Sequence, residues 1–282
     1  MNVEIGSRTL AASVLKMVMA VLCLATVSCA TLPPVKINLL STQDEIELGD
    51  KLSAEIEKQE TVLDDAAVQA YVRGIGDRLA ALSPRQDVAY KFTVIDAPDK
   101  VNAFALPGGH MYVYTGLMLL CESEAELAGV MAHEIGHVAG HHHGESMTRQ
   151  YGMNLIASIL LGNDPGAVSK LAAQLATTAG AMYYSRENER EADATGMNLM
   201  VRAGYNPEGM VGFMKKLLDE ERKHGGGPPL ALFASHPPTA ERVQRLTSLM
   251  AEYPQANHDP AALFADRYRR EAPRPLLKHK GS

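Results

Sequence analysis

The feature of this sequence that most constrains its fold is the pair His133 and His137, which lies inside an apolar, helix-forming segment. The segment begins at Ser123 with Ser-Glu-Ala-Glu, a sequence typical of a helix start. A spacing of four residues puts both imidazoles on one face of the helix, one turn apart. That separation suits two ligands of one tetrahedral zinc ion. Glu134 then lies where it can take a proton from a metal-activated water.

A catalytic zinc site needs a third protein ligand, and the residues offer two alternatives. His143 completes the pattern His-Glu-x-x-His-x-x-Gly-x-x-His, in which the glycine turns the chain so that the last histidine returns to the metal. Glu189 lies instead on a second predicted helix that starts at Ser185, and Asp193 follows one turn later. This pair would supply a carboxylate ligand and a carboxylate that accepts the N–H of a ligating histidine. The residues alone leave both alternatives open.

The rest of the pattern predicts an α+β domain that is mainly helical and contains a small β-sheet. Further helices are expected at residues 41–60, 64–82, 145–161, 166–180, 186–203, 207–224 and 239–252. Strands are expected at residues 88–95, 102–106 and 110–114, the last two joined by the turn Pro107-Gly108-Gly109. We therefore expect one catalytic domain over residues 41–252, followed by a C-terminal tail over residues 253–282.

Residues 1–30 have the pattern of a secretory signal. A basic start precedes an apolar run at residues 17–30, which is shorter than the ~20 residues of a membrane-spanning helix. The run ends in Val-Ser-Cys, which resembles a bacterial lipobox with Cys29 as the lipid acceptor, although Thr26 departs from that pattern. Cleavage after Ala30 is the alternative. We expect residues 31–40 to be a tether, and a lipid on Cys29 to be the chain's one attachment to a membrane.

Composition excludes several classes of function. The 282 residues are 46% hydrophobic and 21% charged, which is ordinary for a globular protein and excludes a disordered chain. The net charge of −6 argues against a basic surface that binds nucleic acid. Three cysteines cannot form a disulfide framework.

Four motifs in order resemble the CAAX prenyl protease/HtpX-type zinc metallopeptidase family, over about residues 40–252. His-Glu-Ile-Gly-His is followed by Ser-Arg-Glu-Asn-Glu-Arg-Glu-Ala-Asp and then by Ser-His-Pro-Pro-Thr-Ala-Glu-Arg; the upstream segments 101–109 and 112–117 also match. The resemblance implies that one zinc ion is bound. It implies the ligands His133, His137 and Glu189, the general base Glu134 and the supporting carboxylate Asp193. The transmembrane helices and C-terminal repeats of longer members are not evident, so the short secreted or lipoprotein branch is expected.

Two further residues are candidates for stabilising the oxyanion of the reaction. His236 precedes two prolines, which favour an extended loop conformation, and Arg242 lies on the following helix. In some relatives the histidine that corresponds to His236 can instead sit on the metal, which suggests a latched state. The segment 102–105 resembles the family's edge strand, which pairs with an extended substrate. Its candidate substrate-binding residues are Asn102, Ala103, Phe104 and Ala105.

The leading hypothesis is a zinc metalloendopeptidase of the bacterial cell envelope that hydrolyses unfolded or misassembled proteins as part of protein quality control. It places the protein in the periplasm, or anchored to the outer membrane, with the outer-membrane assembly machinery as a partner. One alternative is a non-catalytic assembly factor or chaperone with a latched metal site. It is disfavoured because a binding module has no evident need for Glu134. Another alternative is a metal-storage lipoprotein that uses the cluster His141, His142 and His143.

Overall fold

The computed structural model describes residues 38–176, 182–224, 232, 235–237 and 239–272. The predicted signal segment, Cys29 and most of the predicted tether lie outside the described residues, as does the end of the predicted tail. The described residues belong to one compact unit that begins at Asn38. None of their helices combines the length and the apolar character that crossing a bilayer requires.

A mixed sheet of three strands lies at the centre of the unit. Its strands are β1 (Lys91–Ile95), β2 (Ala103–Ala105) and β3 (His110–Tyr114), in the order β1-β3-β2. β1 runs parallel to β3, and β2 runs antiparallel to it, so β2 is an edge strand of this sheet. The turn between β2 and β3 forms the short helix η1 (Pro107–Gly109). Its Gly108 has φ +77, and a Cβ there would lie 2.6 Å from Ile46 Cα, so glycine satisfies both the turn and the packing.

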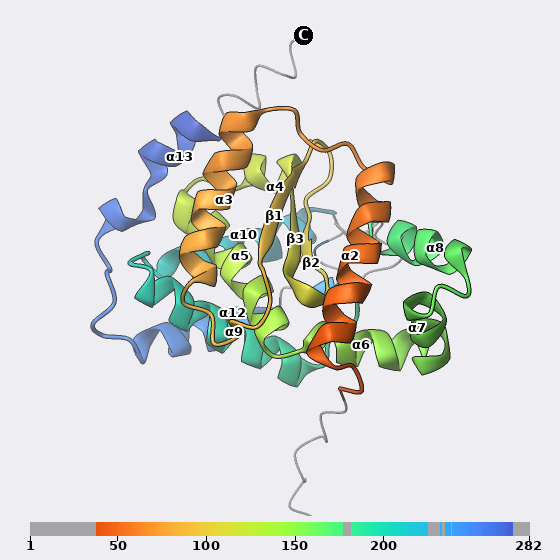
Figure 1. Ribbon diagram of the computed structural model, residues 1–282. Coiled ribbons are helices and arrows are strands. Elements are labelled where there is room, and N and C mark those ends of the chain that lie inside the picture. Colours follow the sequence, from red (N-terminus) through yellow and green to blue (C-terminus); the bar gives the residue numbers. More distant parts are fainter. Residues whose placement is uncertain (1–37, 177–181, 225–231, 233–234, 238, 273–282) are drawn as a thin grey trace, which may run out of the picture. The chain divides into compact units, whose positions relative to one another are not determined.

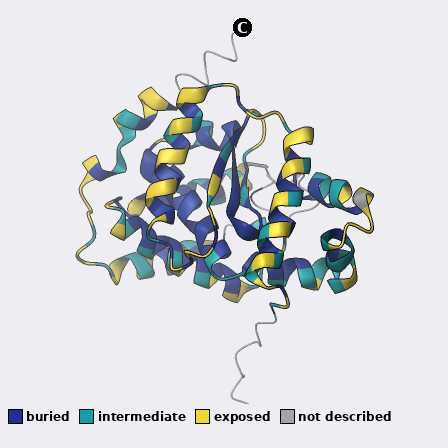
Figure 2. Cartoon of the chain, viewed as in Figure 1, coloured by how far each residue is buried: buried dark blue, intermediate teal, exposed yellow. Residues whose placement is uncertain are grey.

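Helices pack against this sheet through apolar stripes. α2 (Thr42–Gln59) buries Leu48, Leu52 and Ile56 at helical spacing, and it lies against η1 and β3. α3 (Ala66–Ala80), whose N-terminus is capped by the Asp65 carboxylate, packs against β1. Both helices have exposed outer faces and buried inner faces (Figure 2). The sheet lies between them in the view of Figure 1, with α5 (Glu124–Ala139) behind it.

α5 is the central helix, and every residue from Glu124 to Val138 is buried. α9 (Arg186–Arg202) and α10 (Glu208–His224) pack along it. The close approach of α5 and α9 requires small residues, because a Cβ on Gly136 would lie only 2.7 Å from the carbonyl oxygen of Ala192. This approach brings the acidic side chains of α9 within reach of the histidines of α5.

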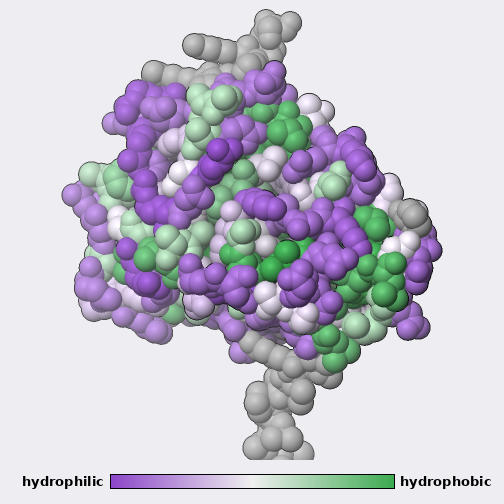
Figure 3. All heavy atoms as spheres, viewed as in Figure 1, coloured by the Kyte–Doolittle hydropathy of each residue, from purple (hydrophilic) through white to green (hydrophobic). Residues whose placement is uncertain are grey.

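The remaining helices are α4 (Thr115–Leu120), α6 (His142–Tyr151), α7 (Met153–Leu160), α8 (Pro165–Leu175), α12 (Ala240–Ala251), η3 (Pro260–Leu263) and α13 (Ala265–Glu271). The single helix expected at residues 145–161 is wrong. It is replaced by α6 and α7, since Gly152 adopts φ +77 and interrupts the hydrogen bonding. The face shown in Figure 3 is largely hydrophilic, with apolar residues gathered over α7. Leu161, which follows α7 in the chain, is 73% exposed.

Part of the predicted C-terminal tail packs onto the domain. Arg267 of α13 donates two hydrogen bonds to the buried Glu124 carboxylate at the start of α5, at 2.6 and 2.5 Å. The Tyr71 and Tyr205 hydroxyls also donate to this carboxylate, each at 2.7 Å. The Glu124 network therefore connects α13 to the helix that carries the two histidines. The expected fold class, mainly helical with a small sheet, is confirmed.

Candidate metal centre

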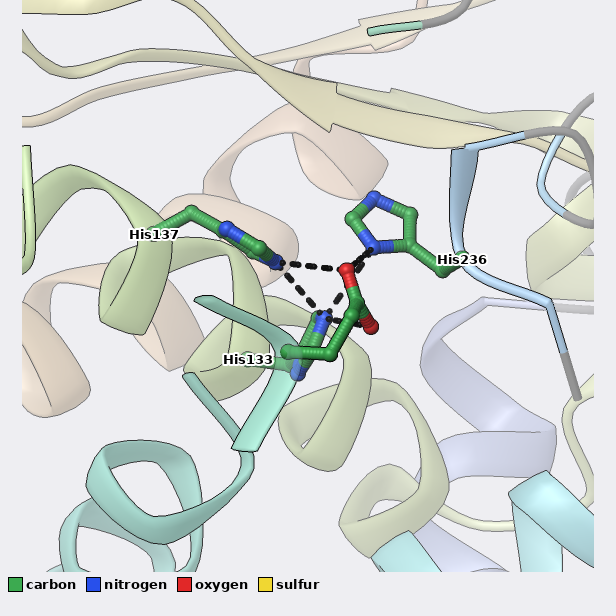
Figure 4. A group of neighbouring side chains, drawn as sticks. His133, His137 and His236 are labelled. Carbon is green, nitrogen blue, oxygen red and sulfur yellow. Dashed lines mark hydrogen bonds and ion pairs between the residues drawn. The ribbon is translucent and has the colours of Figure 1, made fainter. Parts of the chain in front are cut away.

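Four buried side chains converge between α5, α9 and the segment that precedes α12. His133 Nε2 and His137 Nε2 of α5 lie 3.0 Å apart. The Glu189 carboxylate of α9 approaches the same two atoms, with Oε2 3.5 Å from His133 Nε2 and Oε1 3.3 Å from His137 Nε2. His236 Nδ1 completes the group, 2.8 Å from Glu189 Oε1 and 3.2 Å from His133 Nε2. The three imidazoles point toward one another (Figure 4).

This group has the chemistry and the spacing of a zinc site. It offers three imidazole nitrogens and one carboxylate oxygen, a donor set that zinc prefers. Zinc–ligand distances of about 2.0–2.1 Å imply that the donors of a tetrahedral site lie roughly 3.3 Å apart. The separations given above, from 2.8 to 3.5 Å, lie close to that value. These residues therefore fit a zinc ion without rearrangement of the helices.

Glu134 lies beside this group and is nearly completely buried. Its Oε2 accepts a hydrogen bond from the backbone N–H of Ala105 in the edge strand β2, at 3.2 Å. Its Oε1 lies 3.3 Å from His236 Nε2 and makes no hydrogen bond to the described residues. Burial raises the pKa of Glu134, although the nearby histidines oppose this shift. One oxygen is therefore fixed by the sheet, while the other remains available for proton transfer.

Asp193 fixes the orientation of His133. Its Oδ1 lies 2.9 Å from His133 Nδ1, so the proton on that nitrogen points at the carboxylate and Nε2 faces the donor group. Burial disfavours the charged form of Asp193, but Arg242 and His133 outweigh burial and hold the pKa of Asp193 below its usual range.

Arg242 joins the two carboxylates of α9. Its guanidinium contacts Asp193 Oδ1 at 2.8 Å and Glu189 Oε2 at 2.7 Å. Arg245 also contacts Asp193, at 2.5 Å. The sequence suggested Arg242 as an oxyanion donor. In the structure its guanidinium instead contacts the carboxylates of Asp193 and Glu189.

The three histidines after α5 differ in exposure. His142 and His143 are buried, and only His141 is substantially exposed. The reason is a sharp turn at His141, which has φ +58 and directly precedes α6. His142 Nδ1 thereby lies 3.0 Å from His137 Nδ1.

His143, the alternative third ligand, lies outside the group of donor atoms. Its ring centroid is 6.0 Å from that of His137, and burial lowers the pKa of His143 to about 3. Among the described residues, the Glu189 carboxylate belongs to the group of donor atoms. The geometry favours Glu189 over His143.

Two further contacts of the site were also missed by sequence analysis. The Tyr184 ring lies against His137, with centroids 3.9 Å apart, and is stacked on His236 at 5.1 Å. The backbone N–H of Ala105 binds Glu134, as described above. In the sequence, the position of Tyr184 directly before the helix start at Ser185 is only a weak indication that Tyr184 contacts the site. No residue pattern marks a backbone donor.

A small apolar pocket adjoins the site. Its volume is about 30 Å³, and it reaches His133 and Glu134. The apolar side chains that line it come from α5, α10 and the segment before α12: Val130, Met210, Phe213, Met214, Leu217 and Leu232. An apolar group could therefore be bound directly beside the donor group.

Comparisons with known proteins identify the class of this domain. Residues 66–250 match the model of peptidase family M48. The chain therefore belongs to peptidase family M48. Family membership agrees with a zincin-like metallopeptidase domain, as the resemblance of the four motifs implies, but it does not distinguish the CAAX/HtpX branch from others.

The similar proteins are described as proteases. The beta-barrel assembly-enhancing protease of Escherichia coli (strain K12) is 30% identical over 215 residues, which cover 73% of this chain and 44% of that protein. Metalloprotease YcaL of the same strain is 36% identical over 155 residues, or 54% of this chain and 59% of that protein. The mitochondrial metalloendopeptidase OMA1 of Arabidopsis thaliana is 31% identical over 193 residues, which cover 67% of this chain and 37% of that protein. The chain thus spans less than half of the assembly-enhancing protease.

Proposed function

We propose that this protein is a zinc-dependent endopeptidase in which His133, His137 and Glu189 hold one zinc ion. The observation that carries this proposal is the group of four buried donors, whose ligand atoms lie within 4.8 Å of one another, with the Glu134 carboxylate beside it. Zinc in such a site supplies a Lewis acid for the scissile carbonyl and makes a water molecule acidic enough to attack near neutral pH.

Glu134 acts as the general base in this proposal and passes the proton to the leaving amine. The bond from Ala105 N–H keeps one carboxylate oxygen in place while the other receives the proton. Asp193 holds His133 through Nδ1, and Arg242 neutralises the carboxylates of α9.

His236 has two roles in the proposal. With its ring turned out of the donor group, it donates a hydrogen bond to the oxyanion, as its loop position suggested. In the arrangement described here, its Nδ1 belongs to the donor group and its Nε2 faces Glu134. That arrangement supports the latched alternative, in which the protein binds its partners without cleaving them.

The proposed substrates are extended segments of unfolded or misassembled proteins. β2 has β3 on one side only in the described sheet, so a substrate strand can add to its other edge along residues 102–105. This places Asn102, Ala103, Phe104 and Ala105 next to substrate. The apolar pocket beside Glu134 favours a substrate with an apolar side chain near the scissile bond.

The proposed location is the periplasm of a bacterium, with anchoring to the outer membrane through a lipid on Cys29. The signal-like residues 1–30 support this location. The name of the Escherichia coli relative, a beta-barrel assembly-enhancing protease, supports a partner in outer-membrane assembly. We also assign the chain to the short secreted or lipoprotein branch of CAAX/HtpX-type peptidases, on the order of its four motifs.

The test measures zinc content and cleavage of unfolded casein by the purified mature protein. We expect one zinc per chain in the wild type and in His143→Ala, and loss of zinc in Glu189→Ala. Glu134→Gln should keep its zinc and lose at least ~100-fold in activity. Loss of zinc in His143→Ala together with retention in Glu189→Ala would reject the ligand assignment. A zinc-loaded wild type that cleaves no casein would favour the assembly factor.

A further inference from the structure

The two histidines of α5 are held by different partners at their Nδ1 atoms. His133 Nδ1 faces the Asp193 carboxylate, as is common for metal-bound histidines. His137 Nδ1 instead lies 3.0 Å from Nδ1 of a third imidazole, that of His142. The two rings are nearly perpendicular, with an interplanar angle of 77° and centroids 5.0 Å apart. The Nδ1 edge of the His137 ring therefore faces the Nδ1 edge of the His142 ring.

We propose that His142 is a positioning residue of the metal site, which accepts a hydrogen bond from His137 Nδ1–H and thereby aims His137 Nε2 at the ion. This inference rests on the proposed function, since it assumes that His137 binds metal through Nε2. His142 itself contacts neither the ion nor the substrate.

The tautomers of both rings follow from this arrangement. A histidine that offers the lone pair of Nε2 to a metal carries its proton on Nδ1. Because His137 Nδ1 is then the donor, His142 Nδ1 must be the acceptor, and the proton of His142 lies on Nε2. That nitrogen lies 3.4 Å from the Glu191 carboxylate on α9. Each proton in the series from His137 through His142 to Glu191 therefore has an acceptor in front of it.

The chain also leaves room for this ring. His142 is completely buried, and a Cβ on Gly140 would lie 2.3 Å from its Nε2 and 2.6 Å from its Cε1. Gly140 has φ −81, a value open to any residue, so the backbone does not require glycine there. The absence of a side chain at residue 140 serves the placement of the His142 ring.

The structure provides a matched control in the next residue. His143 is also buried, it also lies near His137, and neither of its ring nitrogens makes a hydrogen bond to the described residues. Replacing either histidine by phenylalanine keeps an aromatic ring at the same position. A loss specific to residue 142 therefore reports the hydrogen bond and not the packing.

The experiment measures the zinc dissociation constant by competition with a chelator. Loss of an outer partner of a ligating histidine weakens metal binding 10–100-fold, so we expect about that loss in His142→Phe. His142→Asn should bind zinc within about threefold of wild type, because the Asn side-chain oxygen can replace Nδ1 as acceptor. His143→Phe should match the wild type. Gly140→Ala tests the same contact without changing His142, and it should weaken zinc binding.

A second measurement tests the tautomers directly. Two-bond ¹⁵N–¹H correlation spectra of the zinc-loaded wild type should show His142 protonated at Nε2 and His137 protonated at Nδ1. The inference is overturned if His142 carries its proton on Nδ1. It is also overturned if His142→Phe binds zinc as the wild type does, or if His143→Phe loses as much affinity. A wild type that binds no zinc would instead reject the proposed function.

Discussion

Replacing Asp193 by asparagine tests whether the carboxylates of α9 support the site. Asp193 is 1% exposed and contacts two arginines and one histidine. Arg242 approaches it at 2.8 and 3.1 Å, Arg245 at 2.5 Å and His133 at 2.9 Å. Asp193→Asn keeps the size of the side chain, removes its charge and turns an amide donor toward groups that are themselves donors.

Two effects follow, and their magnitudes can be worked out separately. Breaking a buried ion pair costs about 3–5 kcal/mol, because the remaining charge stays buried. Arg242 keeps its contact with Glu189 at 2.7 Å, so we expect the lower end, about 3 kcal/mol, for the metal-free protein. His133 also loses the acceptor that orients it. This should weaken zinc binding 10–100-fold, which corresponds to about 1.4–2.7 kcal/mol.

The assay has two independent readouts. Urea unfolding in the presence of a chelator gives the free energy of unfolding, and competition with a zinc chelator gives the affinity. The matched control is Glu187→Gln on the exposed side of the same helix, which should change stability by no more than about 0.5 kcal/mol. The reasoning is refuted if Asp193→Asn resembles this control in both readouts.

Other changes test the packing and the metal. Gly136→Ala should destabilise the protein by about 1–3 kcal/mol, because the new Cβ would lie 2.7 Å from a backbone oxygen of α9; an unchanged unfolding midpoint would contradict the close approach of α5 and α9. Arg85→Met leaves the buried Glu45 carboxylate without the cation that contacts it at 2.6 Å, and should cost about 3–5 kcal/mol in urea unfolding; a neutral result would show that the pair is dispensable. Arg267→Gln should release α13 from Glu124 and speed limited proteolysis there, whereas an unchanged digest would mean that α13 is held elsewhere. With free zinc held at 100 times its dissociation constant, removing the zinc with a chelator should lower stability by about 2.7 kcal/mol; an equal melting temperature with and without chelator would argue against a bound ion.

The parts of the fold that sequence analysis could predict depend on local patterns. Period and capping residues identified α3, α5 and α9, and the strand expected at residues 110–114 has those bounds in the structure. The strand expected at residues 88–95 begins only at Lys91. The break at Gly152 was missed because a glycine inside an apolar helical pattern does not reveal its own φ angle.

The candidate site could be predicted as far as its residues are marked by short motifs. His133, His137, Glu134, Glu189 and Asp193 were all selected from spacing or resemblance, and they lie together in the structure.

The contacts of His142, Tyr184 and the Ala105 backbone could not be predicted. They depend on how a left-handed turn, a loop and a strand meet in space. Contacts between residues far apart in the chain do not produce a periodic pattern in the sequence.

The bond between the β2 backbone and Glu134 has a consequence for how clients would be chosen. On the proposed function, β2 both pairs with a substrate protein (a client) and fixes the Glu134 carboxylate. Binding therefore depends on the main-chain conformation of the client more than on the identity of its residues. A folded client must then open a segment before it can pair. When opening is fast relative to cleavage, each additional 1.4 kcal/mol of local stability in the client lowers its rate of cleavage about tenfold. The rate at which such an enzyme cleaves a client would therefore depend on the local stability of that client's fold.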